Sequence, residues 1–304
     1  MRKFIILGCG YLGTNIANYI SEKDAEEVYV MGIENEYNDY LNSNVIFISR
    51  RIEEIDEEDA VLFSNSIVID AVGNTNAADS VKSSSTLFLH NCMAKIEMLS
   101  LIQRFNIKKY IFLSSGGTVY DDSNKLHKED ESISPKSLYA LEKMIEENYL
   151  NIQGIEANVL PYLVLRLSNP YGGVVSKHKK QGIIDVVINK LINDEEIELF
   201  GKLTNTRDYI YIDDVAEAIY RLAISNFTNS IYNVGTGVGT TLRELFDVIE
   251  NTFNKKIKLI EREGTTFNIN SNVLDITKML NDIDFMPETT IADGIAIIKK
   301  VRLG

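Results

Sequence analysis

The sequence predicts an α/β fold built on a doubly wound parallel sheet. Short apolar runs of strand length alternate with longer amphipathic segments from residue 3 to residue 167. The connections are short, and such alternating units form right-handed crossovers that place their strands parallel in one sheet. The first apolar run ends in a glycine-rich turn, Gly8–Gly13, and a helical pattern follows directly. These observations together predict one sheet with helices on both faces.

Each expected element follows from its periodicity and its flanking residues. The strands of the sheet are expected at residues 3–7, 27–31, 45–48, 66–72, 109–113 and 159–167. Helices are expected at about 11–23, 79–104 and 137–151, and the acidic run 53–59 is expected to be a solvated helix face. The pattern changes after residue 172. There we expect a helix at 183–193, strands at 197–200 and 231–234, a strand entering a helix over 205–219 with Asp213 as its cap, a helix after Thr241, and one strand with two short helices in 255–304.

Composition excludes several classes of function. The net charge is −13, with 44 acidic against 31 basic residues, which argues against nucleic-acid or anionic-membrane partners. No apolar run approaches the roughly 18 residues of a membrane span. Cys9 and Cys92 form no disulfide framework, so a reducing, cytoplasmic setting is expected. The histidines are far apart and the cysteines lack ligand spacing, so no metal site is expected.

The glycine turn has the spacing G-x-G-x-x-G between a buried strand and a helix. Gly8 permits the tight turn, Gly10 lets the backbone approach a pyrophosphate, and Gly13 lets the helix pack on the strand. The helix beginning at Tyr11 and Leu12 offers free N–H groups to the anion. Such a motif can be a plain structural turn, but this context favours a Rossmann-type dinucleotide site.

The end of the second strand indicates which dinucleotide is bound. An acid usually stands there and holds the adenosine ribose. Here the position is Met31 or Gly32, and the nearest acids are Glu34 and Glu36. No Arg or Lys occurs in residues 30–49, so nothing there attracts a 2′-phosphate. NAD is therefore favoured over NADP.

These patterns divide the chain into two intimately associated regions. Residues 1–172, with 206–235 returning to them, are predicted to form an NAD-binding Rossmann domain. Residues 173–205 and 236–304 are predicted to form a smaller C-terminal substrate-binding region.

A tyrosine and a lysine stand four residues apart on the expected helix at 137–151. Tyr139 and Lys143 share one helix face because residues i and i+4 are neighbours there. The strand end before this helix carries the hydroxyl residues Ser114, Ser115 and Thr118. A surface Tyr and Lys on an ordinary helix is the alternative. The juxtaposition outlines a proton-transfer site.

Seven motifs spread over nearly the whole chain point to one family. They are GCGYLG at 8–13, SSGGTVY at 114–120, SLYALEK at 137–143, LRLSNPYG at 165–172, TRDYIYIDDVAEAI at 206–219, NVGTGVGTTLREL at 233–245 and NVLDITK at 272–278. In this order they resemble the extended short-chain dehydrogenase/reductase family, in its NAD-dependent epimerase/dehydratase branch acting on nucleotide sugars.

The resemblance implies catalytic roles. Tyr139 is implied as the acid/base and Lys143 as the residue that binds the nicotinamide ribose. A free phenol, with pKa ~10, is a poor base at neutral pH, but a neighbouring ammonium and a cationic nicotinamide favour the phenolate. Many relatives carry a catalytic Ser or Thr where this chain has Gly116. Thr118 is the favoured replacement, with Ser115 close behind.

The resemblance also implies ligand contacts. The implied cofactor contacts are the glycine turn with Tyr11 and Leu12, the strand end Ala71, Val72 and Gly73, then Ser114, Tyr139 and Lys143. The implied substrate contacts are Asn91, Asn169, Gln181, Arg207 and Tyr209. From sequence alone, a plain tight turn explains residues 71–73 as well as a cofactor contact does. For Arg207, the alternative interpretation is a local ion pair with Asp208.

The same motifs narrow the reaction. Relatives that dehydrate a hexose carry a Thr-Asp-Glu where this chain has Gly116-Gly117-Thr118. The leading hypothesis is therefore an NAD-dependent nucleotide-sugar 4-epimerase that acts on a UDP-sugar through a 4-keto intermediate. Its expected setting is polysaccharide biosynthesis. The alternatives are a reductase or dehydrogenase, a 4,6-dehydratase, and a non-catalytic NAD-binding protein.

The resemblance further implies a homodimer in which two long helices of each subunit form a four-helix bundle. Met93, Met98, Leu141 and Ile145 are the apolar residues expected to serve this contact.

Overall fold

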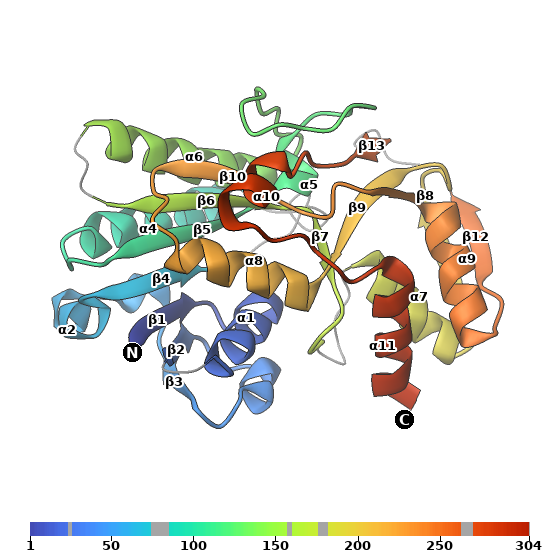
Figure 1. The fold of residues 1–304 in the computed structure, drawn as a ribbon, viewed down its shortest axis with the longest axis horizontal. Coiled ribbons are helices and arrows are strands. Elements are labelled where there is room, and N and C mark those ends of the chain that lie inside the picture. Colours follow the sequence, from blue (N-terminus) through green and yellow to red (C-terminus); the bar gives the residue numbers. More distant parts are fainter. Residues whose placement is uncertain (24–25, 74–84, 157–159, 176–181, 263–269, 304) are drawn as a thin grey trace.

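The computed structural model contains one central parallel sheet, and this confirms the predicted doubly wound α/β fold (Figure 1). The described residues are 1–23, 26–73, 85–156, 160–175, 182–262 and 270–303. The seven strands are β1 (Arg2–Leu7), β2 (Glu26–Gly32), β3 (Val45–Ser49), β4 (Ser66–Asp70), β5 (Lys109–Ser115), β6 (Tyr162–Leu167) and β10 (Ser230–Val234). Their order is β10-β6-β5-β4-β1-β2-β3, and every neighbouring pair is parallel. The order reverses between β1 and β4, so a crevice is expected at their carboxyl ends.

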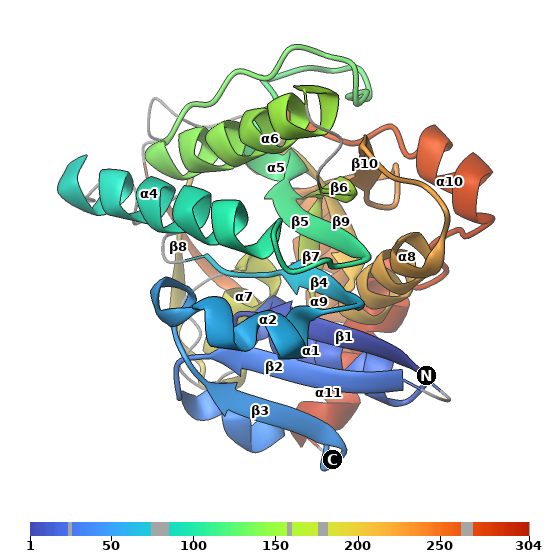
Figure 2. The same ribbon diagram turned by 90° about the vertical axis from the view of Figure 1, so that its left-hand side faces the viewer.

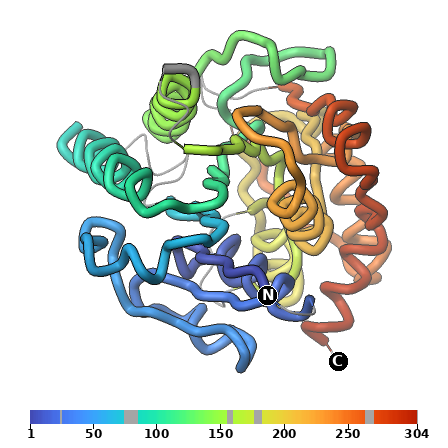
Figure 3. Tube along the Cα trace, turned by 60° about the vertical axis from the view of Figure 1, so that its left-hand side comes forward, coloured from blue at the N-terminus to red at the C-terminus, as the bar shows by residue number. Residues whose placement is uncertain are grey.

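Helices cover both faces of this sheet because the central strands are apolar on both sides. In β1, Phe4 and Ile6 enter one apolar core, while Ile5 and Leu7 enter the other. The first core contains α1 (Tyr11–Ser21) and α8 (Ile212–Ile224). The second contains α2 (Ala60–Phe63), α4 (Ser85–Ile102) and α6 (Leu138–Glu156). Figures 2 and 3 show α4 and α6 side by side on one flank, with α8 on the other.

Smaller sheets and helices stand beside the carboxyl ends of the central strands, at the right of Figure 1. One sheet joins β8 (Glu196–Phe200) to β12 (Lys258–Arg262) in parallel. Another has β9 (Thr206–Tyr211) paired with β7 (Asn169–Tyr171), β11 (Gly239–Thr241) and β13 (Ser271–Asn272). The remaining helices are α5 (Gly116–Val119), α7 (Ile183–Ile192), α9 (Leu242–Phe253), α10 (Thr277–Ile283), α11 (Ile291–Leu303) and the 3₁₀ turns η1 (Glu36–Tyr40), η2 (Ile52–Glu54) and η3 (Glu57–Asp59).

Several boundaries differ from the sequence prediction. The acidic run 53–59 forms short 3₁₀ turns, in which the Asp56 side chain caps η3, in place of the expected helix face. Asp213 is not the cap of α8, because the cap position is Tyr211 and Asp213 lies in the first helical turn. The last fifty residues hold the two expected helices, α10 and α11, but α11 is 13 residues long, and a second strand, β13, accompanies β12.

A buried ion pair fixes α6 over the ends of β5 and β6. The guanidinium of Arg166 on β6 donates to both carboxylate oxygens of Glu147 on α6, with Nη2–Oε2 at 2.7 Å. The Ser114 hydroxyl on β5 donates to the same carboxylate at 2.5 Å. Arg166 also donates to the Tyr120 hydroxyl at 2.8 Å, and Tyr120 donates to Asn233 on β10. One acid on the helix therefore ties three neighbouring strands together.

We predict that Glu147→Gln lowers the free energy of unfolding by about 3–5 kcal/mol, because it leaves a buried guanidinium without its counter-charge. Urea unfolding of the purified protein measures the difference. Glu57→Gln is the matched control, since Glu57 pairs with Arg104 in solvent and should change stability little. Equal midpoints for the two variants would contradict this account.

Candidate active site

The glycine turn forms a close-packed cradle at the switch point between β1 and β4. Gly8 has a φ of +98°, and an added Cβ there would meet the backbone of Ala71 and Val72 at 3.1 Å. A Cβ on Gly13 would stand 1.8 Å from the Gly8 carbonyl oxygen. A Cβ on Gly10 would meet nothing within 4 Å, so this residue faces open space at the start of α1. Helix and strand thus pack at backbone contact, and the free helix N-terminus opens toward an anion.

A cavity of ≈ 460 Å³ opens beside this cradle. It is lined by Gly8 and Gly10, by the strand end Ala71, Val72 and Gly73, and by the carboxyl end of β2. Its volume lies within the range of small-molecule sites. Bare backbone, a helix N-terminus and small residues in one cleft fit a dinucleotide.

Uncharged and basic groups replace the expected acid at the end of β2. The Asn35 amide donates to the carbonyls of Cys9, at 2.8 Å, and Ile33. Arg50 and Arg51 come to the same cavity from the end of β3. The Arg50 guanidinium forms ion pairs with Asp56, just before η3, and with Asp59 in η3, where the Nη1–Oδ1 distance is 2.5 Å. Sequence reasoning missed Asn35, because its position follows from the path of the loop after β2.

Tyr139 and Lys143 lie on one face of α6, as the spacing predicts. The Ser137 hydroxyl accepts from the Ala140 N–H at 3.2 Å and so holds the start of the helix. The Lys143 ammonium lies 5.9 Å from the centroid of the Tyr139 ring and 4.5 Å from that of Phe112. Burial lowers the pKa of Lys143, but the acids around it outweigh burial and raise the pKa above its usual value. Lys143 therefore carries a full positive charge beside Tyr139.

The structure separates the three hydroxyl residues before the Tyr–Lys helix. The Ser114 hydroxyl donates to Glu147, and the Thr118 hydroxyl donates to the carbonyl of Ser115 at 3.4 Å. Ser115 lines a large open cavity. A Cβ on Gly116 would stand 2.8 Å from the Leu274 side chain, so Leu274 fills the space beside that residue. This geometry favours Ser115 over Thr118 as the hydroxyl that faces a substrate.

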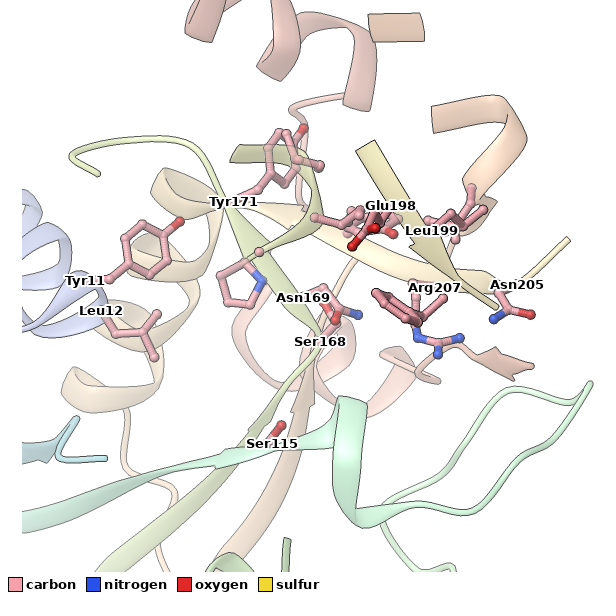
Figure 4. A pocket seen from close by; sticks show the side chains of 17 residues that line it. Tyr11, Leu12, Ser115, Ser168, Asn169, Tyr171, Glu198, Leu199, Asn205 and Arg207 are labelled. Atoms are coloured by element: carbon pink, nitrogen blue, oxygen red, sulfur yellow. The ribbon is translucent and has the colours of Figure 1, made fainter. Parts of the chain in front are cut away.

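The large cavity has a volume of ≈ 630 Å³ and adjoins the glycine turn through Tyr11 and Leu12. Figure 4 shows these two residues on one side, Arg207 on the other, and Asn169 between them. The Asn169 amide donates to the Asp208 carbonyl at 2.8 Å, which fixes its orientation. Arg207 on β9 is half-buried, and its desolvation lowers the pKa of the guanidinium. A half-buried cation in a cleft of this size suits a small anionic ligand.

The other predicted substrate contacts fall in different places. Tyr209 lines the large cavity, and burial raises the pKa of its phenol to about 12. Asn91 lines the cofactor cavity instead, and its amide donates to Glu142 at 3.1 Å. Gln181 lies outside the described residues.

The alternative interpretation of Arg207 and Asp208 as a local ion pair does not hold. Because successive residues of a strand face opposite ways, Asp208 turns from the cavity to the loop after β10. There it accepts from the N–H and hydroxyl of Thr236, at 2.9 and 2.7 Å, and from the N–H of Gly237 at 3.1 Å. Asp208 therefore holds a loop, and Arg207 faces the cavity.

Sequence reasoning missed three polar residues of the large cavity: Ser168, Glu198 and Asn205. The Ser168 hydroxyl is buried and lacks a hydrogen-bond partner among the described residues. Glu198 on β8 is bound by Arg262 on β12, with Nη2–Oε1 at 2.7 Å. Ser168 directly precedes Asn169 in the motif SNPYGG, and this adjacency was the available signal.

No helix in the described part of the chain is long and apolar enough to cross a membrane. Among the same residues, no group of three His, Cys, Asp or Glu side chains is placed to hold a metal ion.

The parallel sheet and the glycine turn between β1 and α1 are those of an α/β dinucleotide-binding protein. Comparison with known proteins identifies the family. Residues 4–235 match the model of the NAD dependent epimerase/dehydratase family, and the chain belongs to this family. Its cofactor is therefore NAD, and its relatives are epimerases, dehydratases and reductases of nucleotide sugars.

Individual relatives span nearly the whole chain. A putative UDP-glucose 4-epimerase of Methanocaldococcus jannaschii is 30% identical over 95% of this chain and 94% of its own length. A dTDP-4-dehydro-6-deoxyglucose reductase of Escherichia coli is 32% identical over 88% of this chain and 84% of its own. The UDP-glucose 4-epimerase of Thermotoga maritima, solved with UDP-glucose, is 25% identical with a TM-score of 0.89, covering 98% of this chain and 99% of that one.

We predict that Ser115→Ala lowers kcat about 10²–10³-fold, as removal of a single donor to a reacting oxygen does elsewhere. Thr118→Val should change kcat little, because that hydroxyl is already bonded to backbone. Both variants are assayed on the nucleotide sugar that the wild-type protein converts. A large loss in Thr118→Val with a small one in Ser115→Ala would reverse the assignment.

Proposed function

We propose that the protein is an NAD-dependent 4-epimerase of a UDP-sugar. The observation that carries the proposal is a single proton-transfer pair, Tyr139 and Lys143, which faces the cofactor strand end Val72–Gly73, in a chain that has Gly116 and Gly117 in place of carboxylates after Ser115. Elimination of water needs a further acid and base, but inversion at C4 needs one proton shuttle. The epimerases among its relatives support this choice.

Tyr139 is proposed to remove the proton of the C4 hydroxyl and later to return it to the C4 oxygen. NAD, when bound, would accept the hydrogen of C4 with its electron pair and give it back to the opposite face of C4. Lys143 holds the nicotinamide ribose and keeps positive charge beside the phenol. Ser115 donates to the C4 oxygen and so orients it. The 4-keto sugar turns between the two steps.

The diphosphate of the substrate is proposed to lie between Asn169 and Arg207. Arg207 lines this cavity, and its guanidinium matches the geometry of phosphate oxygens. Holding the diphosphate at this end leaves the sugar free to turn at the other, near Ser115 and Tyr139. This division of the cavity is what an epimerase requires.

A reductase of a 4-keto sugar is the second candidate. The relative of Escherichia coli, 32% identical, bears the name of such an enzyme. The same residues would serve it, because Tyr139 would donate its proton to a keto oxygen. The two reactions differ in whether the cofactor leaves oxidised after each turnover.

We predict that the purified protein, without added cofactor, interconverts C4 epimers of a UDP-sugar, and that Tyr139→Phe lowers kcat about 10²–10⁴-fold while NAD stays bound. Chromatography of a panel of nucleotide sugars detects the products. Lack of turnover across the panel by NAD-loaded protein would refute the epimerase. Stoichiometric consumption of added NADH with a 4-keto sugar would establish the reductase instead.

The expected homodimer is proposed to form through α4 and α6. Met93 and Leu89 on α4 are more than half exposed, and Leu141 and Ile145 on α6 are partly so. Met98 was wrongly expected in this contact, since it is buried in the core beneath α4. We predict a dimer in sedimentation velocity, and Met93→Asp should produce monomers. A wild-type monomer would contradict this.

A further inference from the structure

Five charged side chains, one of which is Lys143 of the Tyr–Lys pair, are buried together where α4 and α6 meet the end of β4. They are Asp70 at the end of β4, Lys95 on α4, and Glu142, Lys143 and Glu146 on α6. None is more than 8 % exposed. Burial of so many charges is unfavourable unless they are paired. The side chain with the fewest partners is therefore the one whose charged form is least stabilised.

Three of the five have hydrogen-bonded partners, and the Lys143 ammonium lies over the Phe112 ring. Lys95 forms an ion pair with Asp70, and the buried Tyr110 hydroxyl of β5 donates to the same carboxylate at 2.5 Å. Asn91 donates to Glu142 at 3.1 Å. Within the described residues, by contrast, no donor hydrogen-bonds the carboxylate of Glu146.

Glu146 opens on a small cavity that reaches the cofactor strand. This cavity of ≈ 20 Å³ is lined by Val72 and Gly73 at the end of β4, by Tyr139 and Lys143, and by Glu146 itself, together with Asn91, Lys95 and Glu142. The acid therefore lies one helical turn beyond Lys143 and faces the same space, within reach of the field of a positive charge held there.

The surroundings make Glu146 the acid that changes charge near neutral pH. Burial raises its pKa, the ammonium groups of Lys95 and Lys143 lower it, and Asp70 and Glu142 raise it again, with a result of about 7. Asp70 has its pKa lowered, since its ion pair with Lys95 and its other charged neighbours outweigh burial.

The remaining titratable neighbours do not change charge in this range. Burial and Asp70 raise the pKa of Tyr110 well above its usual value. Burial, Glu142 and Glu146 raise the pKa of the Cys92 thiol to about 11. Ionisation of Glu146 therefore adds one negative charge to this group, and its protonation removes that charge.

We infer that Glu146 is a positioning residue for the cofactor: its ionised carboxylate stabilises the positively charged nicotinamide, and its protonated form accompanies the neutral, reduced ring. The inference rests on the proposed function insofar as Tyr139 and Lys143 place the nicotinamide here. During oxidation of the sugar the C4 hydrogen leaves with two electrons, and the hydroxyl proton goes to Tyr139. Glu146 takes up a separate proton from solvent.

Ionisation of Glu146 and binding of the oxidised cofactor should favour each other. A nearby cation favours the carboxylate, so the pKa of Glu146 falls when the oxidised ring is bound. Preference for the oxidised over the reduced cofactor must then rise with pH through about 7, by about tenfold for each unit of difference between the two pKa values.

Competition between the two cofactor forms tests the inference without catalysis. The full-length protein is equilibrated with equal excesses of NAD⁺ and NADH between about pH 6 and pH 8.5, and the bound forms are quantified by chromatography. The bound ratio of oxidised to reduced form should rise roughly tenfold in the wild type. The rise should be clearly smaller in Glu146→Gln, where only the linkage between the Tyr139 phenol and the cationic ring is left. The exposed control Glu195→Gln should behave as the wild type.

Tyr139→Phe identifies the titrating group. The pH dependence should persist in this variant, although its turnover is lost. If Tyr139→Phe abolishes the dependence and Glu146→Gln retains it, the inference is overturned, whereas the proposed acid/base role of Tyr139 stands. A pH-independent ratio in the wild type also overturns it.

A measurement on unaltered protein guards against misfolding of the variant. Exchange of bound NAD⁺ for NADH at neutral pH should produce the infrared carbonyl band of a newly protonated carboxylic acid. Absence of this band in the wild type would overturn the inference whatever the variants show.

Discussion

The active site depends on the buried contact between Glu147 and Arg166. Glu147 follows Lys143 by one helical turn, so its position on α6 sets where Tyr139 and Lys143 lie over the sheet. Its partners, Ser114 and Arg166, are the penultimate residues of β5 and β6. Ser115 at the end of β5, and Ser168 and Asn169 after β6, line the large cavity. One carboxylate thereby holds the proton-transfer helix and the two substrate-lining strand ends in fixed relation. Buried ion pairs are weak sources of stability but tolerate few alternative arrangements, which suits a site whose groups must meet within a fraction of an ångström.

Electrostatics divides the site into two halves. Beneath the nicotinamide position, acids outnumber lysines, and the excess charge can be removed by one proton on Glu146. In the large cavity, Arg207 offers positive charge on the side away from Tyr11 and Leu12. The proposed placement of a cationic ring and an anionic diphosphate would therefore set each beside the opposite charge. Between them, the large cavity presents neutral groups, among them the hydroxyls of Ser115 and Ser168.

Local patterns allowed much of this structure to be predicted. Buried parallel strands, the glycine turn and the Tyr–Lys helix are encoded within a few residues of each other, and the sheet, the family and the cofactor followed from them. The choice between Ser115 and Thr118 could not be made from the sequence motif SSGGTVY. It depends on the turn of α5, which bonds the Thr118 hydroxyl to backbone, and on the distant Leu274, which closes the space beside Gly116. The raised pKa of Glu146 follows from its burial in the folded structure, which the sequence alone does not show.

The central claim is that one bound NAD takes the hydrogen from C4 and gives the same hydrogen back. The most direct measurement follows that atom: UDP-glucose carrying deuterium at C4 is incubated with the purified protein without added cofactor, and the products are examined by NMR and mass spectrometry. The account predicts a C4 epimer that retains deuterium at C4. An epimer that has lost its deuterium to solvent, or a 4-keto sugar as the sole product, would contradict it.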